Sequence, residues 1–323
     1  MTRRQLLAIF ACGRPASVSE RAARYLWSQQ SPDGGWHSTT YGLLRSGQSL
    51  TPFVLEALLR LADPPRYRVE RAVAFLDHHI NADGALGLAN PLLADYPNYA
   101  TALAVRAFLR LGRDVTPLVR YLRQQQFSEE NGWTGDHPAY GAWGMGGVPP
   151  QPPHLQHVDL SMTRYVLEAL SAVGATQADP ALQQAGVFLN RCRNADGGFQ
   201  FTTVVLEANK AGPDRSYGTA TADGVLSLQA IGVSSDGPRR WLRTHHRTDA
   251  VPGFVTPARQ RWAQGLRFYY AAAVAAAAPE LTVAPLIGAP RSDGSFANPE
   301  PIVKEDDPLI ATAFALRAAL RAL

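Results

Sequence analysis

A short glycine-containing turn occurs six times along the chain, and this repetition constrains the fold more than any other feature. The turns lie at residues 33–36, 83–86, 131–133, 196–199, 252–254 and 293–296. Glycine lets the backbone adopt a positive φ, and the aromatic residue or leucine that follows can fill the joint between two helices. The intervals between the turns are irregular, but each is long enough for two helices and their connections. The pattern therefore predicts six repeats of a helix pair.

Two kinds of helix are expected to alternate along these repeats. The segments before the turns carry apolar residues at helical spacing on one face, which is typical of helices at a surface. They are residues 22–29, 71–79, 119–126, 185–192, 239–244 and, as the weakest of the set, 281–288. The segments after the turns are rich in Ala, Leu, Val and Thr on nearly every face, which is typical of buried helices. They are residues 52–62, 99–112, 160–174, 217–232, 262–278 and 307–323.

Six outer helices that alternate with six inner helices predict an all-α fold, the (α/α)6 toroid or barrel. A linear solenoid of helix pairs is the competing architecture, and we favour closure because no polar terminal cap stands out. We expect one barrel domain over residues 16–323, preceded by an N-terminal extension at residues 1–15. The apolar stretch at residues 6–11 is shorter than the core of an export signal, so we expect a leading helix there.

The composition is that of a chain that buries a large core. Hydrophobic residues make up 46% of the 323 residues and charged residues 18%, which excludes a disordered chain. The net charge is +4 without any basic block, so we expect no nucleic-acid partner. Cys12 and Cys192 are too few for a disulfide scaffold or a Cys-rich zinc site. No apolar run is long enough to span a membrane. We expect a cytoplasmic protein, with peripheral membrane contact and the oligomeric state left open.

The turns also resemble a repeat of a known superfamily. A small residue, an aromatic-Leu pair and Gln, followed by Asp-Gly-Gly-Trp, is similar to the repeat of squalene-hopene cyclases, class II terpene cyclases and protein prenyltransferase β-subunits. The clearest copies are at residues 29–36, 193–199 and 291–296. The similarity covers residues 16–323 and resembles a single-domain bacterial member, because squalene-type cyclases carry two such barrels. It implies an isomerase or lyase that cyclises or isomerises an isoprenoid by protonation in an apolar central cavity.

The resemblance also implies a catalytic acid. Class II cyclases protonate an alkene or epoxide with the middle aspartate of a D-x-D-D motif at the start of an inner helix. Asp159 matches that position and is our candidate acid, and His157 is our candidate for orienting or reprotonating it. His157 and Leu160 replace the flanking aspartates. Two residues two apart on a helix point in nearly opposite directions, so the pair can cooperate only in a turn before the helix. The alternative is that Asp159 only caps that helix.

The starts of the inner helices should meet at one mouth of the barrel, because alternate helices run parallel. We expect the substrate there, held by aromatic faces that stabilise a cation and by polar groups. The candidates are Tyr96, Tyr99, Trp143, Asp214, Arg215, Tyr217, Asp223, Phe268, Tyr269, Asp306 and Asp307. Arg215 can bind an anionic head group, with a salt bridge to Asp214 as the alternative. A helix cap is the alternative for Asp307.

We expect neither a metal site nor a cofactor. The zinc ligands of the prenyltransferases have no counterpart, because residues 214–218 lack Cys and residues 307–323 lack His. Two alternatives stay open. His154, His157 and Asp159 have the side-chain types of a metal site, and Glu305, Asp306 and Asp307 offer the oxygen ligands that Mg²⁺ prefers if the substrate is a diphosphate.

Three functions remain open. The first is the isoprenoid cyclase. The second is another α/α-barrel enzyme that uses paired carboxylates, such as a glycosidase, which requires an open groove. The third is a non-catalytic barrel that binds a lipid or a protein partner, because fold alone does not fix function.

Overall fold

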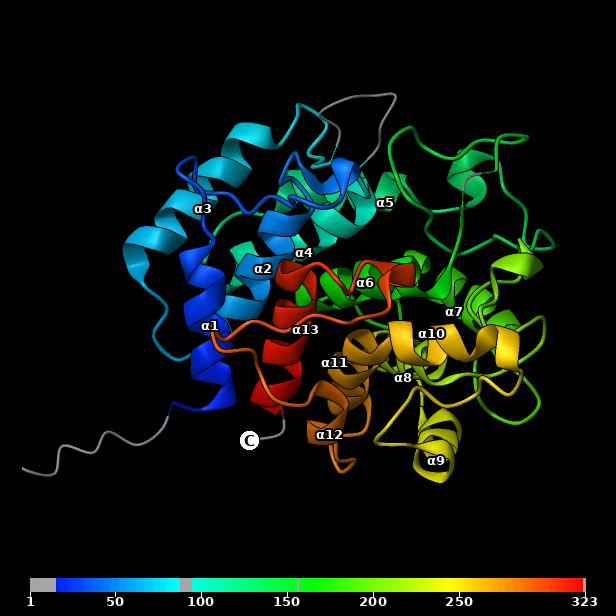
Figure 1. Cartoon of the computed structure of the whole chain (residues 1–323). Helices are drawn as coiled ribbons and strands as arrows, with labels where there is room; N and C mark the ends of the chain where they lie inside the picture. The colour runs from blue at the N-terminus through cyan, green and yellow to red at the C-terminus, as the bar shows by residue number, and fades with distance from the viewer. Residues whose placement is uncertain (1–15, 88–94, 156, 322–323) are drawn as a thin grey trace, which may run out of the picture.

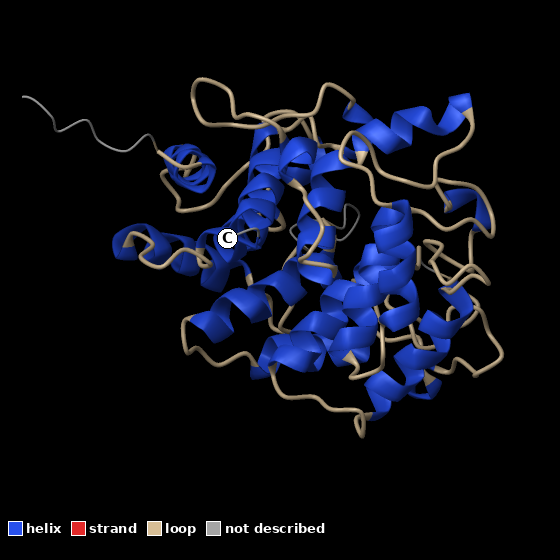
Figure 2. Ribbon diagram, turned by 90° about the horizontal axis from the view of Figure 1, so that it is seen from below, coloured by secondary structure: helices blue, strands red, loops and turns tan. Residues whose placement is uncertain are grey.

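The structure is a computed structural model that describes residues 16–87, 95–155 and 157–321. Over these residues it contains helices, turns and isolated β-bridges but no strand, so the expected all-α class is confirmed (Figure 2). The leading helix that we expect at residues 6–11 lies outside the described residues. The fold is the α/α toroid that the repeats predict.

The inner ring of the described chain consists of six helices. They are α2 (Leu50–Leu58), α4 (Pro97–Arg110), α6 (Leu160–Ala172), α8 (Gly218–Ala230), α11 (Arg267–Ala277) and α13 (Pro308–Arg321). Each helix packs against the next, and α13 packs against α2, which closes the ring and excludes the linear solenoid (Figure 1). Every residue of α2 is buried, as expected for a helix that, apart from Glu56, has apolar or small residues on all sides.

The outer layer covers this ring. Its helices are α1 (Val18–Ser28), α3 (Arg66–His79), α5 (Thr116–Gln124), α7 (Pro180–Cys192), α9 (Asp236–His245) and α12 (Ala284–Ile287). The last of these is a single turn, in agreement with its weak sequence pattern. The segment expected as one inner helix at residues 262–278 is instead split into α10 (Gln260–Gly265) and α11, which meet at Leu266.

The glycine turns join neighbouring repeats through close backbone contacts. Gly34 has a φ of +96°, and a Cβ atom on it would lie 2.3 Å from the carbonyl oxygen of Arg71 on α3. Gly294, in the last turn, has a φ of +92°, and its Cβ would lie 2.6 Å from the carbonyl oxygen of Arg21 on α1. Only glycine fits both the conformation and the space. The same close contact between a glycine turn and a helix backbone therefore links consecutive repeats and also links the last repeat to the first.

The third turn lies at a different place from the one that the sequence pattern indicates. In the first turn, the backbone N–H of Trp36 donates to Thr51 Oγ1 at 3.0 Å, and its indole Nε1 donates to the Leu26 carbonyl at 2.7 Å. Trp143 makes the equivalent bonds, to Thr163 Oγ1 at 3.1 Å and to the Leu122 carbonyl at 2.7 Å. Residues 141–143 therefore form the third turn. The expected turn at residues 131–133 belongs to an inserted loop.

Candidate functional site

Aromatic side chains divide the interior of the barrel into two pockets. Tyr269 and Phe314 line both pockets, and their ring centroids are 5.3 Å apart. Phe53 packs on Phe314 at 4.8 Å, and Tyr99 packs on Tyr165 at 4.3 Å. We call this layer the aromatic partition. The family resemblance implies a single central cavity, but the aromatic partition divides it in two. We call the pocket at the N-terminal ends of the inner helices the N-terminal pocket, and the pocket at their C-terminal ends, at the opposite mouth of the barrel, the C-terminal pocket.

The N-terminal pocket lies where the inner helices begin, which is the expected place. Its volume is about 420 Å³, within the range of small-molecule sites. Apolar and aromatic side chains form most of its wall, from the starts of α2, α4, α6, α11 and α13 and from the loops beside them. Apart from tyrosines, five titratable side chains interrupt this wall in the described chain: His157, Asp159, Lys210, Lys304 and Glu305.

Asp159 and His157 form a hydrogen-bonded pair at the wall of this pocket. Asp159 precedes α6 in an extended conformation, and its Oδ1 accepts the backbone N–H of Met162 at 2.7 Å. Its Oδ2 lies 2.9 Å from His157 Nε2. Asp159 is therefore a helix cap and a partner of His157 at the same time, one oxygen for each role. The hydrogen bond to Asp159 raises the pKa of His157.

The burial of the two side chains differs. The Asp159 side chain is 7% exposed, whereas that of His157 is 41% exposed. The carboxylate therefore faces the interior while the imidazole reaches solvent, so His157 can exchange a proton with water and Asp159 cannot do so directly.

Both lysines of the chain lie in this pocket. Lys210 Nζ lies 3.3 Å from the centroid of the Phe201 ring, and burial lowers the Lys210 pKa to about 8. Lys304 Nζ donates to the Tyr96 hydroxyl at 3.2 Å and lies over the rings of Tyr41 and Tyr96. The pocket thus combines aromatic faces with two ammonium groups. Lys304 was missed by our sequence reasoning, although the scarcity of lysine in an arginine-rich chain is a signal that marks both positions.

Glu305 lies at the edge of the pocket but already has partners. Its carboxylate accepts the backbone N–H groups of Phe268 at 2.9 Å and Tyr269 at 2.7 Å, at the start of α11. The side-chain amide of Asn298 donates a third bond at 3.0 Å. Burial raises the Glu305 pKa to about 7. Its geometry is that of a buried helix cap.

The structure brings together some of the predicted site residues. Tyr96, Tyr99 and Tyr269 line the N-terminal pocket with His157 and Asp159. Asp223 lies at the aromatic partition instead: it accepts from Arg164 Nη1 at 3.0 Å and from the Tyr269 hydroxyl at 2.9 Å. The same hydroxyl bonds Ser161 Oγ at 2.7 Å, so a chain of hydrogen bonds crosses the partition.

Three predicted aromatic residues face the outer layer instead of the pocket. Trp143 belongs to the third turn and is fully buried, with its indole N–H bonded to the Leu122 carbonyl of the outer helix α5. The Tyr217 ring packs 5.3 Å from that of Phe254, and the Phe268 ring packs 5.9 Å from that of Phe296. Each lies near the start of an inner helix, but on the side that turns away from the barrel axis. The expectation that these three line the pocket is therefore wrong.

The remaining predicted residues also lie outside the pocket. Asp214 and Arg215 are exposed in the loop before α8. Asp306 accepts from the Tyr41 hydroxyl, and Asp307 accepts from Ser38 Oγ and from the backbone N–H of Leu309. Asp307 thus has the capping role that the sequence left open.

The Mg²⁺ alternative does not fit these positions. Glu305, Asp306 and Asp307 are consecutive, but each carboxylate is bonded to a different part of the fold. In the described part of the chain, no group of three or more His, Cys, Asp or Glu side chains is arranged to hold a metal ion.

Comparisons with known proteins bear on the fold alone. No protein family and no curated protein sequence matches the chain. Among solved structures, the type II terpene cyclase MstE from Scytonema is similar with a TM-score of 0.63 at 12% identity, covering 94% of this chain and 97% of that one. A protein from Actinoplanes is similar with a TM-score of 0.57 at 16% identity, covering 94% and 98%. Cellobiose 2-epimerase from Spirochaeta thermophila has a TM-score of 0.51 at 14% identity, covering 94% and 96%.

The chain therefore has the α/α-toroid fold shared by a type II terpene cyclase and a sugar epimerase. At these identities the likeness does not extend to the reaction. Among the described helices, none has both the length and the apolar character needed to cross a membrane.

Proposed function

We propose that the chain is an enzyme that binds an isoprenoid in the N-terminal pocket and protonates it to start cyclisation or isomerisation. The observation that supports this most directly is the His157–Asp159 pair, which places a carboxylate oxygen and an imidazole 2.9 Å apart at the wall of a mainly apolar pocket. A variant of the similar cyclase MstE is known in complex with geranylgeranyl dihydroxybenzoate, which carries an isoprenoid chain on an acidic ring.

The proposed step moves one proton. Asp159, in its protonated form, gives its carboxyl proton to an alkene carbon: the O–H bond breaks, a C–H bond forms from the π electrons, the positive charge passes to the neighbouring carbon, and Asp159 is left as the carboxylate. A second π bond of the same chain attacks that carbon and closes a ring. The final cation loses a proton to water, which ends the reaction, and His157 takes up a proton from solvent and passes it to the Asp159 carboxylate, so no net proton is consumed.

The rest of the pocket suits such a substrate. Tyr96, Tyr99 and Tyr269 line the pocket, and the faces of such rings stabilise a cation without attacking it. The ammonium groups of Lys210 and Lys304 suit the anionic head of an isoprenoid acid or diphosphate. The substrate would thus lie with its head at the lysines and an alkene at Asp159.

The alternative with paired carboxylates has weaker support in this pocket. Asp159 and Glu305 are the carboxylates that line it among the described residues, and both oxygens of Glu305 are occupied by backbone N–H groups. A sugar would also leave most of its hydroxyl groups against apolar walls.

Product analysis in D₂O tests the proposal. The protein is incubated with squalene, farnesyl diphosphate, geranylgeranyl diphosphate and geranylgeranyl dihydroxybenzoate, beside Asp159→Asn and a cellobiose control. We expect a cyclic isomer that carries deuterium and, from a diphosphate, still carries the diphosphate. Release of the diphosphate, epimerised cellobiose, or binding of these compounds without turnover would each overturn the proposal.

A further inference from the structure

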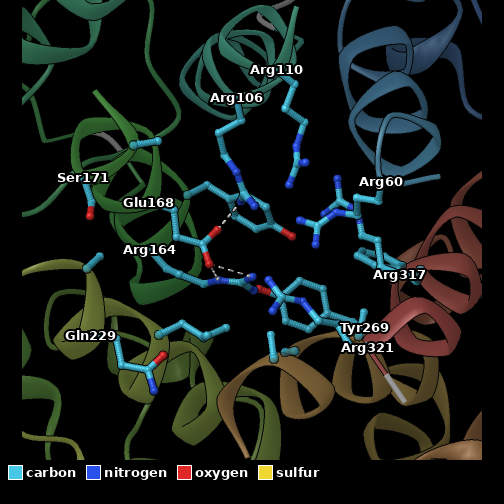
Figure 3. Close-up of a pocket in the computed structure, with 18 of the residues that line it drawn as sticks. Arg60, Arg106, Arg110, Arg164, Glu168, Ser171, Gln229, Tyr269, Arg317 and Arg321 are labelled. Carbon is cyan, nitrogen blue, oxygen red and sulfur yellow. Dashed lines mark hydrogen bonds and ion pairs between the residues drawn. The ribbon is translucent and has the colours of Figure 1, made fainter. Parts of the chain in front are cut away.

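The C-terminal pocket collects six arginines that the sequence scatters over the repeats. Its volume is about 600 Å³, and it lies where the inner helices end. The arginines that line it in the described chain are Arg60, Arg106, Arg110, Arg164, Arg317 and Arg321. In Figure 3 the side chains of Arg60, Arg106 and Arg110 point toward the middle of this space.

Carboxylates neutralise only part of this charge. Glu56 is fully buried and bonds Arg60 at 2.6 Å, Arg106 at 3.0 Å and Arg317 at 2.8 Å. Glu168 bonds Arg106 and, at 3.3 Å, Arg164. With Asp223 behind Arg164, three carboxylates face six guanidinium groups in the described chain.

Two of the arginines have no partner among the residues that the structure describes. Among the described residues, Arg110 and Arg321 make no ion pair and no hydrogen bond through their side chains, and both are exposed at the mouth of the pocket. Their guanidinium groups are therefore free to bind a ligand.

Compensation of the helix dipoles does not account for the cluster. The ends of the inner helices carry partial negative charge, which favours basic side chains there. A basic side chain does this most effectively when it bonds the free carbonyl groups at the helix end, and one that acts only through space contributes at most about 1 kcal/mol. In the described part of this pocket, no arginine side chain bonds a carbonyl group at the end of an inner helix: Arg317 Nη2 donates to the carbonyl of Phe53, which lies within α2, at 3.3 Å.

The chemistry of the cluster favours a phosphate group. Guanidinium forks bind phosphate oxygens in pairs, and a surplus of three positive charges calls for an anion with more than one negative charge. Leu109, Leu226 and alanines of α11 complete the wall and leave an apolar surface for an organic part. The aromatic partition separates this pocket from the lysines of the N-terminal pocket.

We propose that the C-terminal pocket is a second ligand site, which binds a small molecule through a phosphate or diphosphate group. Arg110 and Arg321 bind the anion at the mouth. The arginines around Glu56 and Glu168 lie deeper in the pocket and add a positive electrostatic potential that attracts it. The site is independent of the proton transfer proposed for the opposite mouth.

Isothermal titration calorimetry on the full chain tests this proposal. The probes are inorganic phosphate, inorganic diphosphate and ADP, with citrate as a polycarboxylate. The first two represent the free anion and ADP represents an esterified diphosphate, so the arms distinguish the two sources. The main variant is Arg110→Gln/Arg321→Gln, and the matched control is Arg120→Gln, an exposed arginine of the outer helix α5 without a side-chain partner in the described chain.

We expect at least one phosphate probe to bind, more weakly as salt increases. The double variant should lower its affinity at least tenfold with an unchanged melting temperature, and Arg120→Gln should change it less than twofold. Lys210→Gln/Lys304→Gln removes the ammonium groups of the opposite mouth, so binding that persists in this variant and is lost in the arginine variant belongs to the C-terminal pocket. Absence of phosphate binding, binding of citrate alone, an equal loss in Arg120→Gln, or loss only in the lysine variant would overturn the proposal.

Discussion

Tyr269 and Phe314 meet edge to face between the two pockets of the barrel, at an interplanar angle of 73°. Because both side chains line the two pockets, their rings and the aromatic groups around them divide one hollow into two chemical environments. The mouth at the helix starts holds an acid–histidine pair and two lysines. The mouth at the helix ends holds the arginines.

The hydroxyl group of Tyr269 is a test of this partition. Tyr269→Phe keeps the ring but removes the bonds to Asp223 and Ser161. We expect a loss of about 1 to 3 kcal/mol in the free energy of unfolding, since a buried carboxylate loses a donor. Urea denaturation measures it, and Tyr67→Phe, on a 70%-exposed tyrosine of α3, should change nothing. Equal stability of the two variants would mean that this hydrogen-bond chain contributes nothing.

Asp159→Asn separates the two roles of Asp159. The Asn side-chain oxygen can still accept the Met162 N–H, so the cap of α6 remains, but the side chain can no longer supply a proton. We expect the rate of product formation to fall at least 100-fold, with little change in melting temperature. Asp159→Ala should in addition lose about 1 kcal/mol of stability with the cap. An active Asp159→Asn variant would remove Asp159 from the mechanism.

The pH dependence of His157 follows from its bond to Asp159. Its pKa is raised, so the pair stabilises the folded state fully below the unfolded-state pKa of about 6.5, and this contribution is lost as pH rises through the higher folded-state value. An NMR titration of the histidine Cε1–H signals, with His157→Gln for assignment, measures the shift. Asp159→Asn should bring the midpoint down. A midpoint at or below the ordinary histidine value would contradict the paired geometry.

Lys210 should react unusually readily with amine reagents near neutral pH. Burial lowers its pKa from 10.5 to about 8, so a large share of the side chain is the reactive neutral amine at pH 8. Acetylation followed by peptide mass spectrometry should show a rate at Lys210 that levels off above this pH. A bound isoprenoid should protect it. A rate that rises only near pH 10, as for an exposed lysine, would be inconsistent with its place in the pocket.

Glu56 should be essential for stability. The three arginines around it hold its pKa far below the usual range, so its contribution is present above the unfolded-state pKa of about 4.5 and is lost in acid. Glu56→Gln leaves these guanidinium groups without their shared counter-ion, and we expect a loss of about 3 to 5 kcal/mol by denaturation. Glu70→Gln, which breaks an exposed pair with Arg66, should cost less than about 1 kcal/mol.

The ring of helices could be predicted from the periodicity of the sequence, because the signals that indicate it are local. Apolar faces and glycine turns identify helices and their order, and six repeats that alternate outer with inner helices indicate closure. The third turn was misplaced because residues 131–133 imitate the motif, although Gly141 lies nearer the midpoint between Gly84 and Gly197 and gives the more even spacing.

The site was predicted only in part, because the start of a helix is easier to locate than the direction of its side chains. Asp159 and Tyr99 point toward the axis, whereas Phe268 and Tyr217 point to the outer layer. The arginine cluster was missed because Arg60, Arg106 and Arg317 lie in different repeats and meet only when the ring is closed.

The packing of α1 against α13 has a consequence for biosynthesis. The outer helix α1 is synthesised before the inner helix α13, so α1 cannot pack against α13 until the rest of the barrel has been translated. Until α13 has been made, the faces of α1 and α2 that pack against it have no partner and stay exposed on the nascent chain.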